Sequence, residues 1–226
     1  MAATATRPDQ MVSVGLGGAP GSRGGNGFHK SGGGKDGGGD FRFSPARYRI
    51  GVWVAMGSIL MLFVALTSAY IVRSAAAPDW KPVAMPKVLW LSTGLLIVSS
   101  ITIEIARRSL KQQRDQLYTR WLINTVALGA GFVGSQLFAW RQLVKQGVYL
   151  ATNPYSSFFY LFTAVHGVHL LGGLLALTFL LVRTRRKRDT LEGELRRVGA
   201  ADAVSLYWHF MDALWISLFL LLMFWR

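Results

Sequence analysis

The stretch FFYLFTAVHGVHLLGGLLALTFLLV, residues Phe158–Val182, decides the fold. It contains no Asp, Glu, Lys or Arg, and about 20 apolar residues in a helix are enough to cross the hydrocarbon core of a bilayer. Its apolar residues surround the helix instead of forming one stripe, which argues against a soluble amphipathic bundle. The sequence therefore predicts that this segment spans a membrane.

Four more stretches have the same character. The connections between neighbouring stretches are 14 to 21 residues long, too short for another domain. We therefore predict an all-α polytopic membrane protein, a bundle of five transmembrane helices over residues 46–226. The predicted spans are residues 50–72, 88–106, 121–140, 158–182 and 204–225.

Residues 1–45 have a different composition. They contain the glycine clusters GLGG, GSRGGNG and SGGGKDGGGD, which cannot bury enough apolar surface to offset the entropy lost on ordering. They also lack the compact apolar core that follows the basic start of a signal peptide. We predict a disordered, Gly-rich cytoplasmic tail.

Composition and charge exclude several classes of function. The chain has no cysteine, so it has no disulfide, thiolate metal site or cysteine nucleophile. Its net charge of +14 does not indicate nucleic-acid binding, because 19 of the 25 Lys and Arg residues lie on one predicted side of the membrane. The positive-inside rule then places the N-terminus in the cytoplasm and the C-terminus outside.

Few ionisable groups lie inside the predicted spans, and such groups are costly there, so each raises a functional question. They are Glu104, His166, His169, His209 and Asp212. His166 and His169 share a helix face, but two adjacent imidazoles are an incomplete metal site. A bis-histidine haem would need one of them together with His209. We favour neutral histidines that hydrogen-bond to a neighbouring helix or a lipid headgroup, and we assign no metal ligand.

The other ionisable groups also allow two interpretations. His209 and Asp212 are one helical turn apart, so they can form a hydrogen bond or a buried ion pair. A proton path is the alternative, and we favour the structural role. Glu104 precedes Arg107 and Arg108 by one turn, which is typical of an ion pair at the membrane surface.

The spans also carry small residues that allow close helix packing. Gly172 and Gly173 follow His169, and small residues at such positions let a neighbouring membrane helix approach closely. No nucleophile–base arrangement, phosphate-binding glycine loop or complete metal set appears in the sequence. The residues alone therefore predict a non-catalytic membrane subunit.

Two motifs together resemble a known family. FFYLFTAVHGVHLLGG, followed about 35 residues later by YWHFMDALWISLFLL, is similar to the last two helices of cytochrome c oxidase subunit III. Upstream, VWVAMGSILMLFVALTSAYIVR, LWLSTGLLIVSSITIEIARRSL and GSQLFAWRQLVKQGVYLATNPYSS resemble the preceding helices of that family. The resemblance covers about residues 48–226 and fits the five-helix form of the family.

This resemblance implies an accessory subunit of a haem–copper terminal oxidase in a bacterial plasma membrane. Such a subunit has no catalytic centre, haem or copper of its own. It packs on subunit I, where oxygen is reduced, and accompanies subunit II and in some complexes a small subunit IV. It binds phospholipid and supports proton uptake and turnover. Haem and copper are expected in the partner subunits, and no nucleic acid is involved.

The resemblance also assigns roles to residues. It implies that His166, His169, His209 and Asp212 are interior polar contacts. Lipid or packing contacts are expected from the small-polar step of the second span and from other motif residues, namely Ser99, Ser100, Thr102, Glu104, Trp208, Gly172 and Gly173. One departure is Ile59, which stands where many relatives have a membrane-embedded glutamate, so a proton-linked role of that carboxylate is in doubt here.

Several functions remain open at this point. The subunit of a cytochrome c oxidase is favoured over that of a quinol oxidase or a homologue associated with nitric oxide reductase. An independent b-type cytochrome would use His166 or His169 together with His209. A small transporter would use Asp212 and Glu104, but the halves of the chain show no convincing internal repeat.

Overall fold

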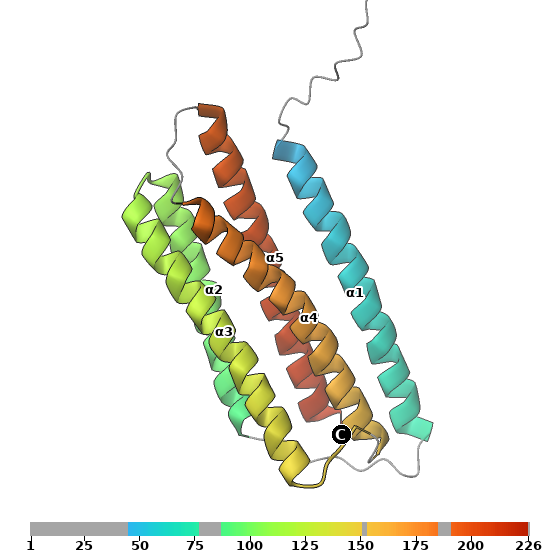
Figure 1. Cartoon of the computed structure of the whole chain (residues 1–226). Coiled ribbons are helices and arrows are strands. Elements are labelled where there is room, and N and C mark those ends of the chain that lie inside the picture. The colour runs from blue at the N-terminus through green and yellow to red at the C-terminus, as the bar shows by residue number, and fades with distance from the viewer. Residues whose placement is uncertain (1–44, 77–86, 151–152, 185–190, 226) are drawn as a thin grey trace, which may run out of the picture. The chain divides into compact units, whose positions relative to one another are not determined.

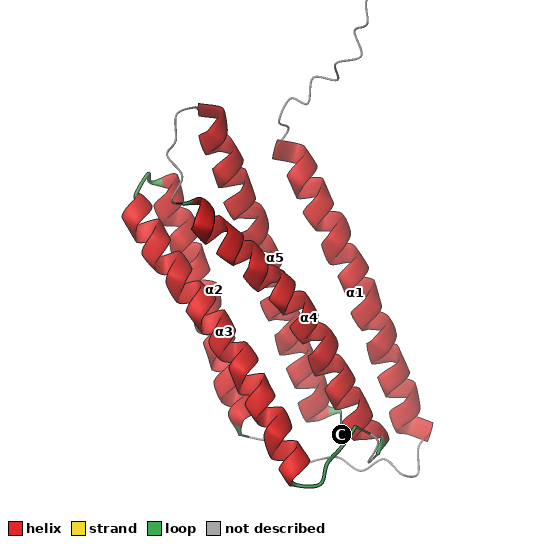
Figure 2. Ribbon diagram, in the orientation of Figure 1, coloured by secondary structure: helices red, strands yellow, loops and turns green. Residues whose placement is uncertain are grey.

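The computed structural model describes residues 45–76, 87–150, 153–184 and 191–225. The predicted disordered tail lies outside these residues except for Pro45, which begins the first helix. The described chain forms five helices and no strand, so the predicted all-α class is confirmed (Figure 2). They are α1 (Pro45–Ala76), α2 (Val88–Lys111), α3 (Asp115–Lys145), α4 (Pro154–Arg183) and α5 (Leu191–Phe224). Each is long and apolar enough to cross a membrane.

Most of the helices extend beyond the apolar spans predicted from the sequence. α3 covers 31 residues and α5 covers 34, which at 1.5 Å per residue is longer than a hydrocarbon core of about 30 Å. Polar side chains do not interrupt the backbone hydrogen bonds of a helix, so the helices continue into the flanking charged segments. The loops between helices are therefore shorter than the connections between the predicted spans.

Local sequence explains several helix ends. The Asn153 side chain accepts a hydrogen bond from the Ser156 amide (2.9 Å), the Ser156 hydroxyl accepts one from the Asn153 amide, and Pro154 occupies the first turn of α4. This capping box satisfies amides that the helix leaves unpaired. At the end of α3, Gly147 has φ of 77°, and the Val148 amide bonds to the Leu143 carbonyl, as in a Schellman motif.

The helices of the bundle have a definite order of neighbours. α2 packs on α3, α3 on α4, α4 on α5 and α5 on α2, so these four helices enclose a shared interior. Among the described helices, α1 packs on α4 and α5 and not on α2 or α3 (Figure 1). The largest fully buried side chains of the interior include Trp208, Trp215 and Phe132.

Candidate functional site: polar contacts inside the bundle

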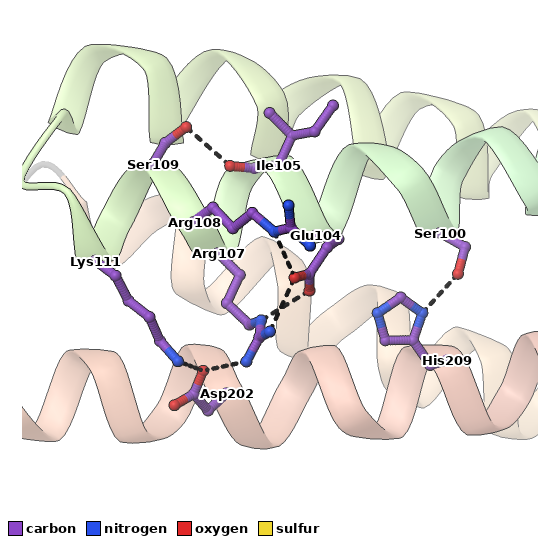
Figure 3. A network of polar contacts seen from close by, with 9 residues as sticks. All are labelled: Ser100, Glu104, Ile105, Arg107, Arg108, Ser109, Lys111, Asp202 and His209. Carbon is purple, nitrogen blue, oxygen red and sulfur yellow. Dashed lines mark hydrogen bonds and ion pairs between the residues drawn. The ribbon is translucent and has the colours of Figure 1, made fainter.

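Charged side chains link α2 to α5 near the basic end of the bundle (Figure 3). Arg107 donates two hydrogen bonds to Glu104, at 2.8 and 2.9 Å, and Arg108 donates one at 2.9 Å. Asp202 of α5 pairs with Arg107 (3.2 Å) and with Lys111 (3.0 Å). Arg107 therefore bridges a carboxylate on its own helix and one on α5. We call these five residues the basic-end cluster.

A second polar contact joins the same two helices deeper in the bundle. The Ser100 hydroxyl and Nδ1 of His209 are 2.6 Å apart (Figure 3). Ser100 also lies beside Asp212, whose carboxyl group is buried. His209 thus bonds across to α2, and no bond joins it to Asp212.

Trp208 occupies the centre of the four-helix interior. Its indole Nε1 donates to the Ser99 hydroxyl of α2 at 3.0 Å. A methyl group placed on Gly129 of α3 would lie 2.8 Å from the indole ring, and one on Gly173 of α4 would lie 3.3 Å from it. Small residues on two helices therefore make room for this ring. Gly172 has no such neighbour, because a methyl group there would meet nothing within 4 Å.

Hydroxyl groups form further links between helices. Thr102 of α2 and Thr125 of α3 are hydrogen-bonded at 2.8 Å in the buried interface. Because the cost of an unpaired hydroxyl is high away from water, such pairs hold membrane helices in a fixed rotation.

The two histidines of α4 have different surroundings. His166 is fully buried, with ring centroids 5.1 Å from Trp215 and 6.0 Å from Phe132, and neither of its ring nitrogens has a hydrogen-bond partner within the described chain. His169 bonds through Nδ1 to the Val165 carbonyl of its own helix at 2.8 Å. Its ring faces Phe63 of α1. The two imidazoles therefore do not converge on a common point.

The arrangement does not provide a metal centre within the residues that the structure describes. No group of three or more His, Cys, Asp or Glu side chains comes together there. His169 uses Nδ1 on its own helix, and His209 uses Nδ1 on Ser100. Other polar groups among the described residues bond across to a neighbouring helix, as Trp208 does to Ser99.

Several interior contacts were missed from the sequence. They involve the uncharged polar or aromatic residues Tyr70, Ser92, Thr93, Thr125, Ser135 and Trp215. Ser92 bonds to Ser135 at 2.8 Å, and the Trp215 indole donates to Thr93 at 3.1 Å. These residues carry no charge, so ionisable groups within the spans do not reveal them. A survey of every hydroxyl and amide inside the predicted spans would have found most of them.

Comparison with known proteins decides the family. A sequence model described as cytochrome c oxidase subunit III matches residues 40–226. The chain belongs to the cytochrome c oxidase subunit III family. The resemblance seen in the HGVH and YWHFMD motifs is thereby confirmed, and a subunit III is a part of a multi-subunit oxidase.

Individual members of the family are similar over most of their length. The probable cytochrome c oxidase subunit 3 of Nocardia farcinica is 35% identical over 179 residues, which is 77% of this chain and 86% of the relative. The cytochrome c oxidase subunit 3 of Bacillus sp. PS3 is 30% identical, over 75% of this chain and 82% of the relative. The quinol oxidase subunit 3 of Bacillus subtilis is 29% identical, over 75% and 83%.

Family membership places the polar contacts in context. The HGVH and YWHFMD motifs include the buried side chains His166 on α4 and Trp208 and Asp212 on α5. The SSIT step of α2 supplies hydroxyls that bond to the YWHFMD motif. Ile59 is a buried apolar residue of α1.

Proposed function

We propose that this chain is the accessory, non-redox subunit III of a haem–copper terminal oxidase of aerobic respiration. The match of the family over residues 40–226 carries the proposal. In this role the chain packs on subunit I, with subunit II and a small subunit IV in the same complex. Haem and copper belong to the partner subunits, where oxygen is reduced.

A non-redox role agrees with the surroundings of the histidines. A haem between two helices needs imidazoles on opposite faces of one ring. His166 is enclosed by the rings of Phe132 and Trp215, and His209 is held by Ser100. These contacts support a packing role for the motif histidines, as does the position of Trp208 between the glycines of α3 and α4.

We place the chain in a bacterial plasma membrane with the N-terminus in the cytoplasm. The end of α2, the start of α3 and the start of α5 lie at one end of the bundle (Figure 1). Basic residues of this end include Arg107, Arg108, Lys111, Arg114 and Arg197. Positive charge is favoured on the cytoplasmic side, so this end faces the cytoplasm.

Phospholipid is proposed to occupy two grooves beside α1. One groove, of about 590 Å³, lies between α1 and α5 and is lined by aliphatic and aromatic side chains that include Leu60, Phe63 and Leu214. The other, of about 480 Å³, is lined by small residues of α1, α4 and α5 such as Ala55, Ala176 and Ala203. Both surfaces have the chemistry of an acyl-chain site.

We propose that this subunit supports proton uptake by the oxidase. The complex that contains it should therefore sustain turnover for longer than the complex that lacks it. The basic-end cluster supports this role because it places carboxylates and cations at the proposed cytoplasmic surface, next to the deeper groups Ser100, His209 and Asp212. The test is loss of sustained turnover when the subunit is removed from the assembled oxidase.

A mild-detergent purification of the tagged chain from its own membranes tests the assembly. Haem and copper spectra, together with a large multi-span partner identified by mass spectrometry, are expected. The control is the same chain expressed without the other subunits, which should be colourless. A chain that retains haem when purified alone would contradict the non-redox role.

The electron donor of the complex is proposed to be cytochrome c. The relatives of highest identity reported above carry that name, but the quinol oxidase subunit 3 of Bacillus subtilis is nearly as similar. Oxygen consumption by the purified complex distinguishes the two. Activity with reduced cytochrome c supports the first assignment, and activity with a quinol alone supports the second.

A further inference from the structure

His166 and Gln136 are among the buried polar side chains of the bundle that lack hydrogen-bond partners within the described chain. Both ring nitrogens of His166 and both amide atoms of Gln136 are in this state. His166 is 0% exposed and Gln136 is 8% exposed. Buried groups of this kind are normally paired with protein or with ordered water.

The register of α3 and α4 brings these two side chains to the same level. Phe132 of α3 contacts the ring of His166, and Trp140 of α3 donates to the Thr163 hydroxyl of α4 at 3.1 Å. Gln136 lies one helical turn from both Phe132 and Trp140, on the same buried face. It therefore faces the turn of α4 between Thr163 and His166.

The neighbouring polar groups are already engaged. The Thr163 hydroxyl donates to the Phe159 carbonyl and accepts from Trp140. The indole of Trp215, which covers His166, donates to Thr93. Ser135, next to Gln136, is bonded to Ser92 of α2. None of these groups supplies the hydrogen bonds that His166 and Gln136 lack.

We propose that His166 and Gln136 together hold a water molecule between α3 and α4, inside the membrane-spanning bundle. A neutral imidazole offers one N–H donor and one acceptor nitrogen, and a glutamine amide offers an N–H₂ donor and a carbonyl acceptor. Water is both donor and acceptor and typically makes about three hydrogen bonds in a buried site. It thus complements both side chains, while the aromatic rings of Phe132 and Trp215 close the site.

The site is distinct from the basic-end cluster and does not depend on the identity of the oxidase. Its function is to join α3 and α4 through a polar contact at a level where the surrounding side chains are apolar. The proposal is therefore tested on the full chain in whatever assembly it is purified with in mild detergent.

Radiolytic labelling in H₂¹⁸O tests the site directly. X-rays generate hydroxyl radicals from bound water, which oxidise the side chains beside it even when these are buried. Oxidation with ¹⁸O is expected at Phe132 and Trp215. Trp208 is the internal reference, because it is equally buried and its indole is bonded to Ser99. Labelling at Phe132 no greater than at Trp208 would overturn the proposal.

Variants show whether these two side chains hold the water. Gln136→Leu should reduce labelling of Phe132 several-fold, and the matched control Gln142→Leu, on the same helix but not in this buried face, should leave it unchanged. If Gln136→Leu does not fold because it strands His166, the double variant Gln136→Leu/His166→Phe removes both polar groups. Persistent labelling of Phe132 in the variant that folds overturns the proposal.

An experimental structure of the same assembly, at a resolution that shows ordered water, gives an independent outcome. Density bonded to both His166 and Gln136 supports the site. A direct hydrogen bond between the two side chains, with no density between α3 and α4, overturns it.

Discussion

α1 and the four-helix group α2–α5 are held in the bundle by different means. The helices α2 to α5 are linked by pairs of polar side chains at several levels, of which Ser92–Ser135, Thr102–Thr125 and Trp208–Ser99 are examples. α1 has apolar grooves on two sides. In its most apolar stretch 17% of the residues are buried, compared with 44% in α5.

The polar contacts of α1 are concentrated at one end. The Tyr70 hydroxyl donates to the Trp225 carbonyl at 2.5 Å, and the Trp225 indole donates to the Ser74 hydroxyl at 3.0 Å. The fully buried Tyr70 ring also packs edge-on against Phe158 and Phe162 of α4. α1 is therefore anchored at its C-terminal end, and the rest of its position depends on apolar packing.

This difference shows which interactions hold each group of helices in position. Lipid is as apolar as leucine, so burying an aliphatic side chain between helices gains little, and close packing with hydrogen bonds gains more. The four-helix group has both close packing and interhelical hydrogen bonds along its length. Among the described side chains of α1, hydrogen bonds to the other helices occur near Tyr70. Under the proposed function, the rest of its surface is left for lipid and partner subunits.

The largest expected effect comes from Tyr70→Ala. It removes a fully buried ring and its hydrogen bond, at a cost of about 3 kcal/mol from the values for buried aromatic residues. The C-terminal end of α1 should separate from α5. Spin labels attached through Val72→Cys and Phe224→Cys, both exposed positions in a chain without cysteine, measure the separation.

The control for this helix is Val54→Ala, which truncates an exposed residue of α1. A narrow distance distribution is expected for the parent and for this control, and a broad one for Tyr70→Ala. An unchanged distribution in Tyr70→Ala would mean that other contacts anchor α1.

The next effect tests the centre of the four-helix group. Gly129→Ala places a methyl group 2.8 Å from the indole of Trp208, and overpacking of this kind costs about 1–3 kcal/mol. Trp208 cannot move away freely, because Ser99 holds its Nε1 and Gly173 borders it on α4. The free energy of unfolding, measured by titration from mild detergent into denaturing detergent, should fall.

Gly134→Ala is the matched control on the same helix. A methyl group there meets no atom within 4 Å, and alanine has a higher helix propensity than glycine. Its stability should equal or exceed that of the parent. Equal losses for Gly129→Ala and Gly134→Ala would show that Trp208 accommodates the methyl group.

The sequence predicted the spans of both parts but not the contacts between helices. Uncharged stretches near 20 residues reveal a membrane helix, so the five helices followed directly. The Ser99–Trp208 pair did not follow, because it depends on the rotation of α2 relative to α5, and one sequence does not fix that rotation. Ser99, Ser100, Thr102 and Trp208 could be selected as packing candidates only through the family motifs.

The pairing of His209 shows the same limit. Its spacing from Asp212 allows a bond within α5, and that local pattern was all the sequence offered. In the structure His209 instead bonds to the Ser100 hydroxyl of α2. Gln136 is uncharged, so the charge pattern of the sequence does not single it out. The neighbours of a buried amide depend on how the adjacent helices pack. The sequence alone therefore does not predict that Gln136 faces the same turn as His166.

A smaller effect is expected from a single hydrogen bond of the four-helix group. Thr93→Val keeps the shape of the side chain and removes the acceptor of the Trp215 indole. Bonds between membrane helices contribute about 0.6 kcal/mol on average and up to about 1.7, so a loss of about 1 kcal/mol is expected in the same detergent titration. Thr178→Val is the control, because that exposed hydroxyl donates only to its own helix at Leu174. Equal losses in the two variants would assign the effect to helix propensity.

The smallest effect is expected in the basic-end cluster, where the difference between two adjacent arginines is the test. Arg107 is 32% exposed and bridges Glu104 and Asp202, whereas Arg108 is 71% exposed and contacts Glu104 on its own helix. Solvent and salt screen such pairs, which contribute about 0–1 kcal/mol. Arg107→Gln should reduce stability at low salt and lose that effect at high salt, while Arg108→Gln should change little at either. If both variants behave alike, the bridge to α5 adds nothing, and the hydrogen bonds of the interior alone hold α2 against α5.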